Sequence, residues 1–268
     1  MRIALAQFAP TLGDVPANRR RAQGAVEEAE RAGAGLVVFP ELFLSGYAVD
    51  QAVGETAVPA GAAAEIAAGD ATVALGFHEL AGEATYNSVA VAAPGRLLHV
   101  QRKLFPVAYP PFSEHQQYAR GEELRAVDSD AGRLAVLICN DAWQPIFPSL
   151  AVLDGAEILV MPAASSTAFE EAEPHWRAIT SFFARVLRCY VVFVNRVGGE
   201  AGLTFWGGSH IIGPSGEIVA EAPRLEEALV LGEIDVAKVR AQRAQLPLES
   251  DPRLDLVHRE LGRLSRKQ

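Results

Sequence analysis

The chain has 268 residues, half of them hydrophobic and 21% charged, so it can bury a sizeable core and is not disordered. Its formal net charge of −9 argues against nucleic acid and anionic membranes as partners, because both attract basic surfaces. No apolar run approaches the roughly 20 residues of a spanning helix, and no signal-peptide pattern is present. We expect a cytoplasmic protein with a single domain over residues 1–268 that acts on a small molecule.

Apolar runs of strand length alternate along the chain with amphipathic stretches of helix length, the pattern of an α/β fold. Tight reversals at 94–95 and 213–216 resemble hairpin turns, so the sheets are expected to be mixed. The expected strands are 3–7, 35–39, 72–77, 88–92, 97–101, 134–138, 158–161, 191–194, 209–212, 218–221 and 228–233. The expected helices are 16–32, 61–68, 146–154, 174–188 and 236–245.

Two parts of the chain resemble each other. Residues 2–40 contain a strand, a helix and a strand that are similar to those in residues 133–162. Two halves related by a pseudo-two-fold axis would explain this, although buried strands read as Val/Ile/Leu runs in any protein. Glu41 follows the first part and Ala163 follows the second, so the fold itself does not require a carboxylate after this strand.

Only two cysteines occur, too few for a disulfide framework and without the spacing of a zinc site. The six histidines are scattered and form no His-Glu-x-x-His pair, so no metal site is expected. Cys139 closes the apolar run 133–138 and precedes a turn into a helix, where oriented N–H groups can lower the pKa of a thiol. A small buried hydrophobe is the alternative for Cys139 and the expectation for Cys189.

Glu41 and Lys103 also stand at strand ends. Glu41 follows the apolar run 35–40, where desolvation can raise the pKa of a carboxyl group, as a general base facing a thiol requires. A helix-capping or surface glutamate is the alternative. Lys103 is one of three lysines among 24 basic residues. Because sites in open α/β sheets gather beyond the carboxyl ends of strands, we expect Glu41, Lys103 and Cys139 to lie together.

These residues and their neighbours resemble the nitrilase superfamily of carbon–nitrogen hydrolases, whose members share a Glu-Lys-Cys triad. The matching segments cover nearly the whole chain and are 39–47 around Glu41, 86–104 around Lys103, 137–141 around Cys139, and 195–209. The resemblance implies a four-layer α-β-β-α sandwich with mixed sheets that forms a homodimer or a higher homo-oligomer. The implied chemistry requires no cofactor.

The resemblance assigns Cys139 as nucleophile, Glu41 as general base and Lys103 as oxyanion donor, in a reaction through a thioester. Glu114 would orient Lys103 or the substrate, with an ordinary loop carboxylate as the alternative. Residues near the nucleophile would bind substrate, although core packing is an equal alternative for the aromatic ones. They are Tyr47, Asn140, Trp143, Ala163, Ala164 and Trp176.

The two residues after Cys139 indicate the class of substrate. Nitrilases of the superfamily tend to carry Trp-Glu there, whereas this chain has Asn140-Asp141, closer to amidases, carbamoylases and glutaminases. We therefore expect hydrolysis of an amide or an N-carbamoyl amine, with release of ammonia or an amine. The segments 194–199 and 205–208 are similar both to N-carbamoylputrescine amidases and to the glutaminase domain of NAD synthetases.

Three other functions fit the sequence less well. A catalytically silent relative that keeps the fold for binding would have no reason to retain the four proposed catalytic side chains together. A nitrilase acting on nitriles is disfavoured by Asn140-Asp141. A nucleotide-binding protein is disfavoured because residues 5–10, after the first strand, contain no glycine-rich phosphate loop.

Overall fold

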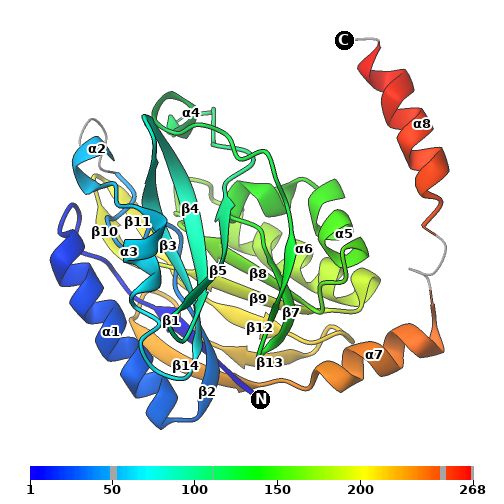
Figure 1. Cartoon of the computed structure of the whole chain (residues 1–268), viewed down its shortest axis with the longest axis horizontal. Coiled ribbons are helices and arrows are strands. Elements are labelled where there is room, and N and C mark those ends of the chain that lie inside the picture. The colour runs from blue at the N-terminus through cyan, green and yellow to red at the C-terminus, as the bar shows by residue number, and fades with distance from the viewer. Residues whose placement is uncertain (49–52, 111, 248–251, 267–268) are drawn as a thin grey trace.

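Two six-stranded mixed sheets face each other at the centre of the molecule, and helices cover their outer faces (Figure 1). The computed structural model describes residues 1–48, 53–110, 112–247 and 252–266. The four-layer α-β-β-α sandwich implied by the sequence resemblance is confirmed. No helix in these described ranges is long and apolar enough to cross a membrane.

The first sheet has the strand order β14-β1-β2-β3-β4-β5. The strands β1, β2 and β3 are parallel, and the other three are antiparallel to their neighbours. The hairpin expected at 94–95 joins β4 to β5. The strands are β1 (Arg2–Gln7), β2 (Ala34–Val38), β3 (Thr72–Ala81), β4 (Ala84–Ala93), β5 (Arg96–Arg102) and β14 (Ala228–Glu233).

The second sheet has the order β13-β12-β9-β8-β7-β6, again with three parallel strands at its centre. Read from β6, its topology repeats that of the first sheet read from β14, so the internal resemblance in the sequence corresponds to a repeated topology. The hairpin β10 (Val197–Glu200) and β11 (Leu203–Trp206) lies outside both sheets. The strands of the second sheet are β6 (Ala126–Ser129), β7 (Gly132–Val136), β8 (Ile158–Ala163), β9 (Tyr190–Asn195), β12 (His210–Ile212) and β13 (Ile218–Glu221).

A continuous apolar layer joins the two sheets. Because side chains alternate between the two faces of a strand, every second residue of the central strands enters this layer. Parallel strands covered on both faces are apolar on both faces, which is why they appear in the sequence as unbroken hydrophobic runs. Members of the inner layer include Leu5, Val38, Val136, Val160 and Val192.

Helices α1 (Val15–Arg31) and α3 (Ala60–Ala64) cover the first sheet, and α5 (Ile146–Leu153) and α6 (Ala172–Leu187) cover the second (Figure 1). The side chain of Asp14 caps α1 by accepting from Ala17 N at 2.9 Å. The buried face of α1 follows helical spacing and consists mainly of Ala22, Ala25, Val26 and Ala29.

Most expected elements agree with the structure to within a few residues, including α7 (Val236–Gln245). Five of the elements that were not expected are short or end in glycine-rich loops, namely β6, β10, β11, α2 (Val53–Thr56) and α4 (Glu114–Gln117). The helix α8 (Leu254–Ser265) was also not expected and extends away from the sandwich (Figure 1). It has no buried residue, and its leucines are exposed.

Gly76 on β3 allows the loop that carries Glu41 to lie directly against the sheet. The backbone N–H of Leu44 donates to the carbonyl of Gly76 at 3.1 Å. A Cβ at position 76 would lie 2.2 Å from the carbonyl oxygen of Pro40 and 2.5 Å from the backbone N of Leu42. These are backbone atoms and cannot swing aside, so the close approach requires glycine.

We predict that Gly76→Ala lowers the free energy of unfolding by about 1–3 kcal/mol, because the added methyl group overpacks the Glu41 loop. Gly24→Ala is the matched control, since a Cβ at this exposed position of α1 would meet nothing within 4 Å. Removing a glycine from a helix should stabilise the control by about 0.5–1 kcal/mol. Urea unfolding of both variants would test this, and a fully stable Gly76→Ala protein would contradict it.

Candidate active site

Four residues singled out in the sequence meet at one edge of the sandwich. Glu41 lies in the turn after β2, Lys103 directly follows β5, and Glu114 begins α4. Cys139 opens the 3-10 helix η2 (Cys139–Trp143), which follows β7. Since β2 and β7 belong to different sheets, the site is built where the two halves of the sandwich join.

The Lys103 ammonium lies between two carboxylates. Its Nζ is 2.6 Å from Glu41 Oε1 and 2.7 Å from Glu114 Oε2, and all three side chains are buried. Because an unpaired buried charge costs several kcal/mol, each of the three depends on the others. The ammonium also donates to Glu114 Oε1 at 2.9 Å, so three carboxylate oxygens surround its three N–H groups. The described residues include no group of three or more His, Cys, Asp and Glu that could hold a metal ion.

Donors from both sheets hold the Glu41 carboxylate. Oε1 accepts from Asn87 Nδ2 on β4 at 2.7 Å, in addition to Lys103. Oε2 accepts from the backbone N–H of Ala164, after β8, at 2.9 Å. A carboxylate oxygen can accept two hydrogen bonds, and Oε2 has this one donor among the described residues, so it has capacity for another proton donor.

Tyr47 and the loop after Lys103 hold the Glu114 carboxylate. Tyr47 OH donates to Oε1 at 2.6 Å, and the backbone N–H of Val107 donates to Oε2 at 3.0 Å. The backbone N–H of Tyr47 in turn donates to Glu200 Oε1 at 2.8 Å. Glu200 forms a buried ion pair with Arg196 at 2.7 Å. Tyr47 thus links the β10–β11 hairpin, through its backbone, to the Glu114 carboxylate, through its hydroxyl.

A turn with an uncommon backbone conformation presents Cys139. Its φ is +46°, in the left-handed region that residues other than glycine seldom adopt. The Asp141 carboxylate stabilises this turn, because Oδ2 accepts from the backbone N–H of Ile138 at 3.1 Å. Oδ1 accepts from the N–H groups of residues 104 and 105 at 3.0 and 2.8 Å. Asp141 therefore ties the residue before Cys139 to the residues after Lys103.

Burial and the cluster of charges shift the pKa values of the site. Burial raises the pKa of Glu41, with Lys103 opposing and Glu114 reinforcing the shift. Burial acts against the Lys103 ammonium, but Glu114 and Glu41 outweigh it and hold the pKa of Lys103 well above its ordinary value. Lys103 is therefore a permanent cation, and Glu41 is a stronger base than an exposed glutamate.

The expected lowering of the Cys139 pKa is wrong. Burial, followed by the charge of Glu41, raises the pKa of this thiol well above its ordinary value. Lys103 and the backbone N–H of Ala164 favour the thiolate, but they are outweighed. The prediction considered only the local turn, whereas the two carboxylates come from distant parts of the chain. At neutral pH the cysteine is a thiol, so its use as a nucleophile requires a base.

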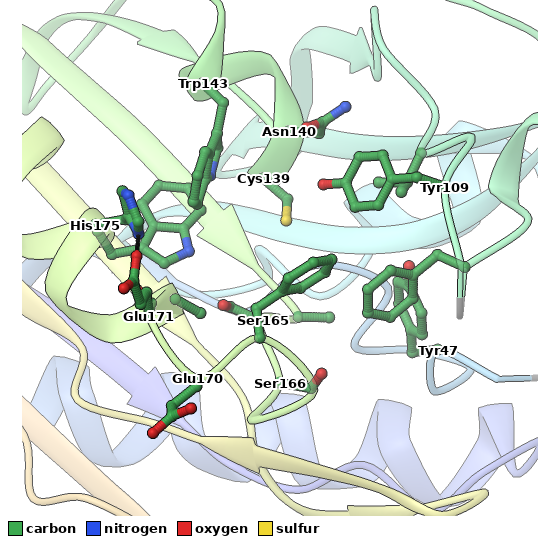
Figure 2. A pocket seen from close by; sticks show the side chains of 16 residues that line it. Tyr47, Tyr109, Cys139, Asn140, Trp143, Ser165, Ser166, Glu170, Glu171 and His175 are labelled. Atoms are coloured by element: carbon green, nitrogen blue, oxygen red, sulfur yellow. Dashed lines mark hydrogen bonds and ion pairs between the residues drawn. The ribbon is translucent and has the colours of Figure 1, made fainter.

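A cavity of about 340 Å³ opens beside Cys139 (Figure 2). Five of the residues expected to contact substrate line it, namely Tyr47, Asn140, Trp143, Ala164 and Trp176. Ala163 is not among the lining residues, because it is the last residue of β8 and packs into the apolar layer under α5 and α6. Neighbouring residues at a strand end face opposite sides, which separates Ala163 from Ala164.

Ten further lining residues are absent from the predicted site residues. They come from the loop after Lys103, from the segment between β8 and α6 and from the first turn of α6, and they include Tyr109, Phe112, Phe169, Glu170, Glu171 and His175. In Figure 2 the hydroxyl of Tyr109 points toward the sulfur of Cys139. Tyr109 and Phe112 precede Glu114 within the same short segment, and this proximity to a predicted site residue could have indicated them. Residues 169–171 carry no periodic pattern that distinguishes them from an ordinary loop.

The second cysteine has a different environment. Cys189 is fully buried, with its thiol 3.8 Å from the carbonyl oxygen of Phe183 on α6. It belongs to the apolar layer between α6 and the second sheet. The expectation that Cys189 acts as a small buried hydrophobe is confirmed.

The chain is similar over most of its length to known proteins. A family model described as carbon-nitrogen hydrolase matches residues 2–244. The chain is 31% identical to an N-carbamoylputrescine amidase from Arabidopsis thaliana, covering 91% of this chain and 89% of that protein. A solved member of branch 10 of the nitrilase superfamily, from Saccharomyces cerevisiae, has a TM-score of 0.83 at 25% identity, covering 94% of this chain and 96% of that one.

A second group of relatives is longer than this chain. A glutamine-dependent NAD(+) synthetase from Thermotoga maritima is 32% identical over 88% of this chain, which covers 42% of the synthetase. The chain thus spans less than half the length of the synthetases that it matches. The similarity concerns one part of those proteins.

We predict that Asp141→Asn disrupts the site. Burial raises the pKa of Asp141 to about 7, yet both of its oxygens face backbone N–H groups. An amide would turn its NH₂ against at least one of these donors, and one buried unsatisfied group costs about 1–3 kcal/mol. Thermal unfolding should show this loss of stability, while Asp128→Asn, at an exposed carboxylate on β6, should change it by less than about 0.5 kcal/mol. Equal stability of the two variants would contradict the role of Asp141.

Proposed function

The chain belongs to the carbon–nitrogen hydrolase family of the nitrilase superfamily, and we propose that it hydrolyses an amide or an N-carbamoyl amine with Cys139 as nucleophile. One observation carries the proposal. A permanent cation, Lys103, and a carboxylate of raised pKa, Glu41, are buried beside a thiol at the wall of a cavity. A silent binding protein would gain nothing from such a costly arrangement of buried charge.

In the first half of the reaction, Glu41 accepts the thiol proton as Cys139 Sγ attacks the carbonyl carbon. Oε2 of Glu41 is suited to this, because it has capacity for one more proton donor. A positioned base of this kind typically contributes about 10²–10⁴ in rate. The carbonyl π electrons move to the oxygen, so attack produces a negatively charged tetrahedral species.

Lys103 stabilises the oxyanion together with the backbone N–H of Asn140. Glu114 contacts the ammonium through both of its oxygens, and one of these contacts would give way to the substrate oxygen. The permanent charge is already in place before the negative charge develops, so little reorganisation is needed. Glu114 is a positioning residue in this scheme, because its contacts hold Lys103 and Tyr47.

Collapse of the tetrahedral species breaks the C–N bond and leaves an acyl thioester on Cys139. Glu41 returns its proton to the departing nitrogen, so ammonia or an amine leaves uncharged. Water then enters, Glu41 accepts one of its protons, and the hydroxyl group adds to the thioester carbon. Breaking of the C–S bond, with proton return to sulfur, releases the acid and restores the thiol.

We predict that acid-quenched mixtures of enzyme and a primary amide contain a Cys139 peptide whose mass is increased by the acyl group. Cys139→Ser should lack the adduct and turnover, because a hydroxyl is a far weaker nucleophile beside the same base. Cys189→Ser is the matched control and should keep both, since this residue lies in the apolar layer under α6. Intact and peptide mass spectrometry, with ammonia release as the rate measurement, would test this.

Two outcomes would contradict the proposal. Cys139→Ser with most of the wild-type turnover would exclude the thioester route. Preferential hydrolysis of nitriles, in a panel with primary amides and N-carbamoyl amines, would exclude the proposed substrate class.

We predict that Lys103→Arg lowers kcat by a factor on the order of 10² or more, the effect of losing one oxyanion donor. A broad guanidinium cannot point its charge as a compact ammonium does, and here it must also fit a fully buried site. Overpacking should therefore lower the free energy of unfolding by about 1–3 kcal/mol as well. The control is Lys238→Arg on the exposed side of α7, which should match wild type in both measurements. Near-normal kcat in Lys103→Arg would remove Lys103 from the reaction.

A further inference from the structure

The cavity beside Cys139 has walls suited to a cation. Six aromatic side chains line it, and aromatic faces attract cations such as an ammonium group. The residues with a full charge in the lining are Glu170 and Glu171, both exposed carboxylates. Neither arginine nor lysine occurs among the described residues that line the cavity. The electrostatic character of the cavity is therefore negative.

The nearby cations are engaged elsewhere. Lys103 is completely buried and lies between Glu41 and Glu114, so it is not part of the cavity wall. On α6, Arg177 pairs with Glu173 and Glu221. Neither cation is therefore available to the part of a substrate that lies far from its scissile bond.

Among the described lining residues, His175 is the one whose side chain has a basic nitrogen. Its Nδ1 is hydrogen bonded to the backbone carbonyl of Glu171 at 2.7 Å, and its ring lies 5.6 Å from that of Trp143. The same Nδ1 is 3.9 Å from the Glu171 carboxylate. Figure 2 shows Glu171 and His175 together on one side of Cys139, with Tyr109 and Tyr47 on the other. Any charge on His175 would thus be partly balanced by its neighbour.

Resting on the proposed amide hydrolysis, we infer that this cavity selects amides whose far end is an ammonium group over those whose far end is a carboxylate. A substrate ammonium would meet aromatic faces and two carboxylates without a lysine or arginine competing in the wall. A substrate carboxylate would lose its hydration, meet like charges and find no permanent cation. An uncharged substrate should fall between the two.

The inference separates this chain from the relatives that are named as glutamine-dependent. Glutamine carries a carboxylate at the end far from its amide, beside an ammonium. In this cavity the carboxylate would have no permanent cationic partner among the described lining residues. We therefore expect glutamine to be a poor substrate despite the sequence similarity.

The test uses three amides of similar length, ε-aminocaproamide, heptanamide and adipamic acid, which end in an ammonium, a methyl group and a carboxylate. Ammonia release should give kcat/KM values in that order, with a cation-to-anion ratio on the order of 10². Hydrolysis of none of the three would count against the proposed function itself. Hydrolysis of all three at rates within threefold would leave that function standing and overturn the selection by charge.

Variants then locate the selectivity. In the double variant Glu170→Gln/Glu171→Gln, the ratio of kcat/KM for ε-aminocaproamide to kcat/KM for heptanamide should fall at least tenfold, because two carboxylates are lost. Heptanamide is uncharged and serves as the internal reference within each variant. Glu123→Gln removes a charge from an exposed carboxylate outside the cavity and should keep the wild-type ratio. An equal fall in Glu123→Gln would show that net charge, and not the cavity, selects the cation. A preference for adipamic acid that disappears in His175→Gln would overturn the inference and identify His175 as a reader of anions.

Discussion

The buried ammonium of Lys103 is the interaction on which the site depends. A lone charge at this depth would cost several kcal/mol, and two carboxylates within 2.7 Å offset that cost. Each carboxylate is in turn held by backbone and side-chain donors, so the charges cannot shift without breaking further hydrogen bonds. The same cation that makes the carboxylates tolerable in the interior is the one that we propose for a substrate oxyanion.

The sandwich supplies what this charge cluster needs. Glu41 and Lys103 come from the first sheet, whereas Cys139 and its turn come from the second, and the apolar layer between the sheets fixes their separation. Gly76 lets the Glu41 loop lie against β3, and the Asp141 carboxylate joins the cysteine turn to the segment after Lys103. These close contacts between chain segments hold the side chains of the site in place.

Charge has two different roles on the two sides of Cys139. Behind it, one ammonium lies between two carboxylates, an arrangement that we propose serves proton transfer and an oxyanion. On the cavity side, aromatic rings and carboxylates prevail without a permanent cation among the described lining residues. The cavity wall that we propose selects substrates by the charge of their far end thus differs in charge from the buried cluster behind Cys139.

The sequence by itself determined the layered fold and singled out the residues that meet at the candidate site. Apolar runs ending in Glu41, Lys103 and Cys139 were visible because strand burial is a local, periodic signal. Only the tertiary structure decided the direction of the Cys139 pKa shift, the separation of Ala163 from Ala164, and the positions of Tyr109, Glu171 and His175 in the cavity wall. Each of these depends on groups distant in the chain that meet through packing, and electrostatic fields and cavity walls are set by such through-space neighbours, which no local pattern encodes.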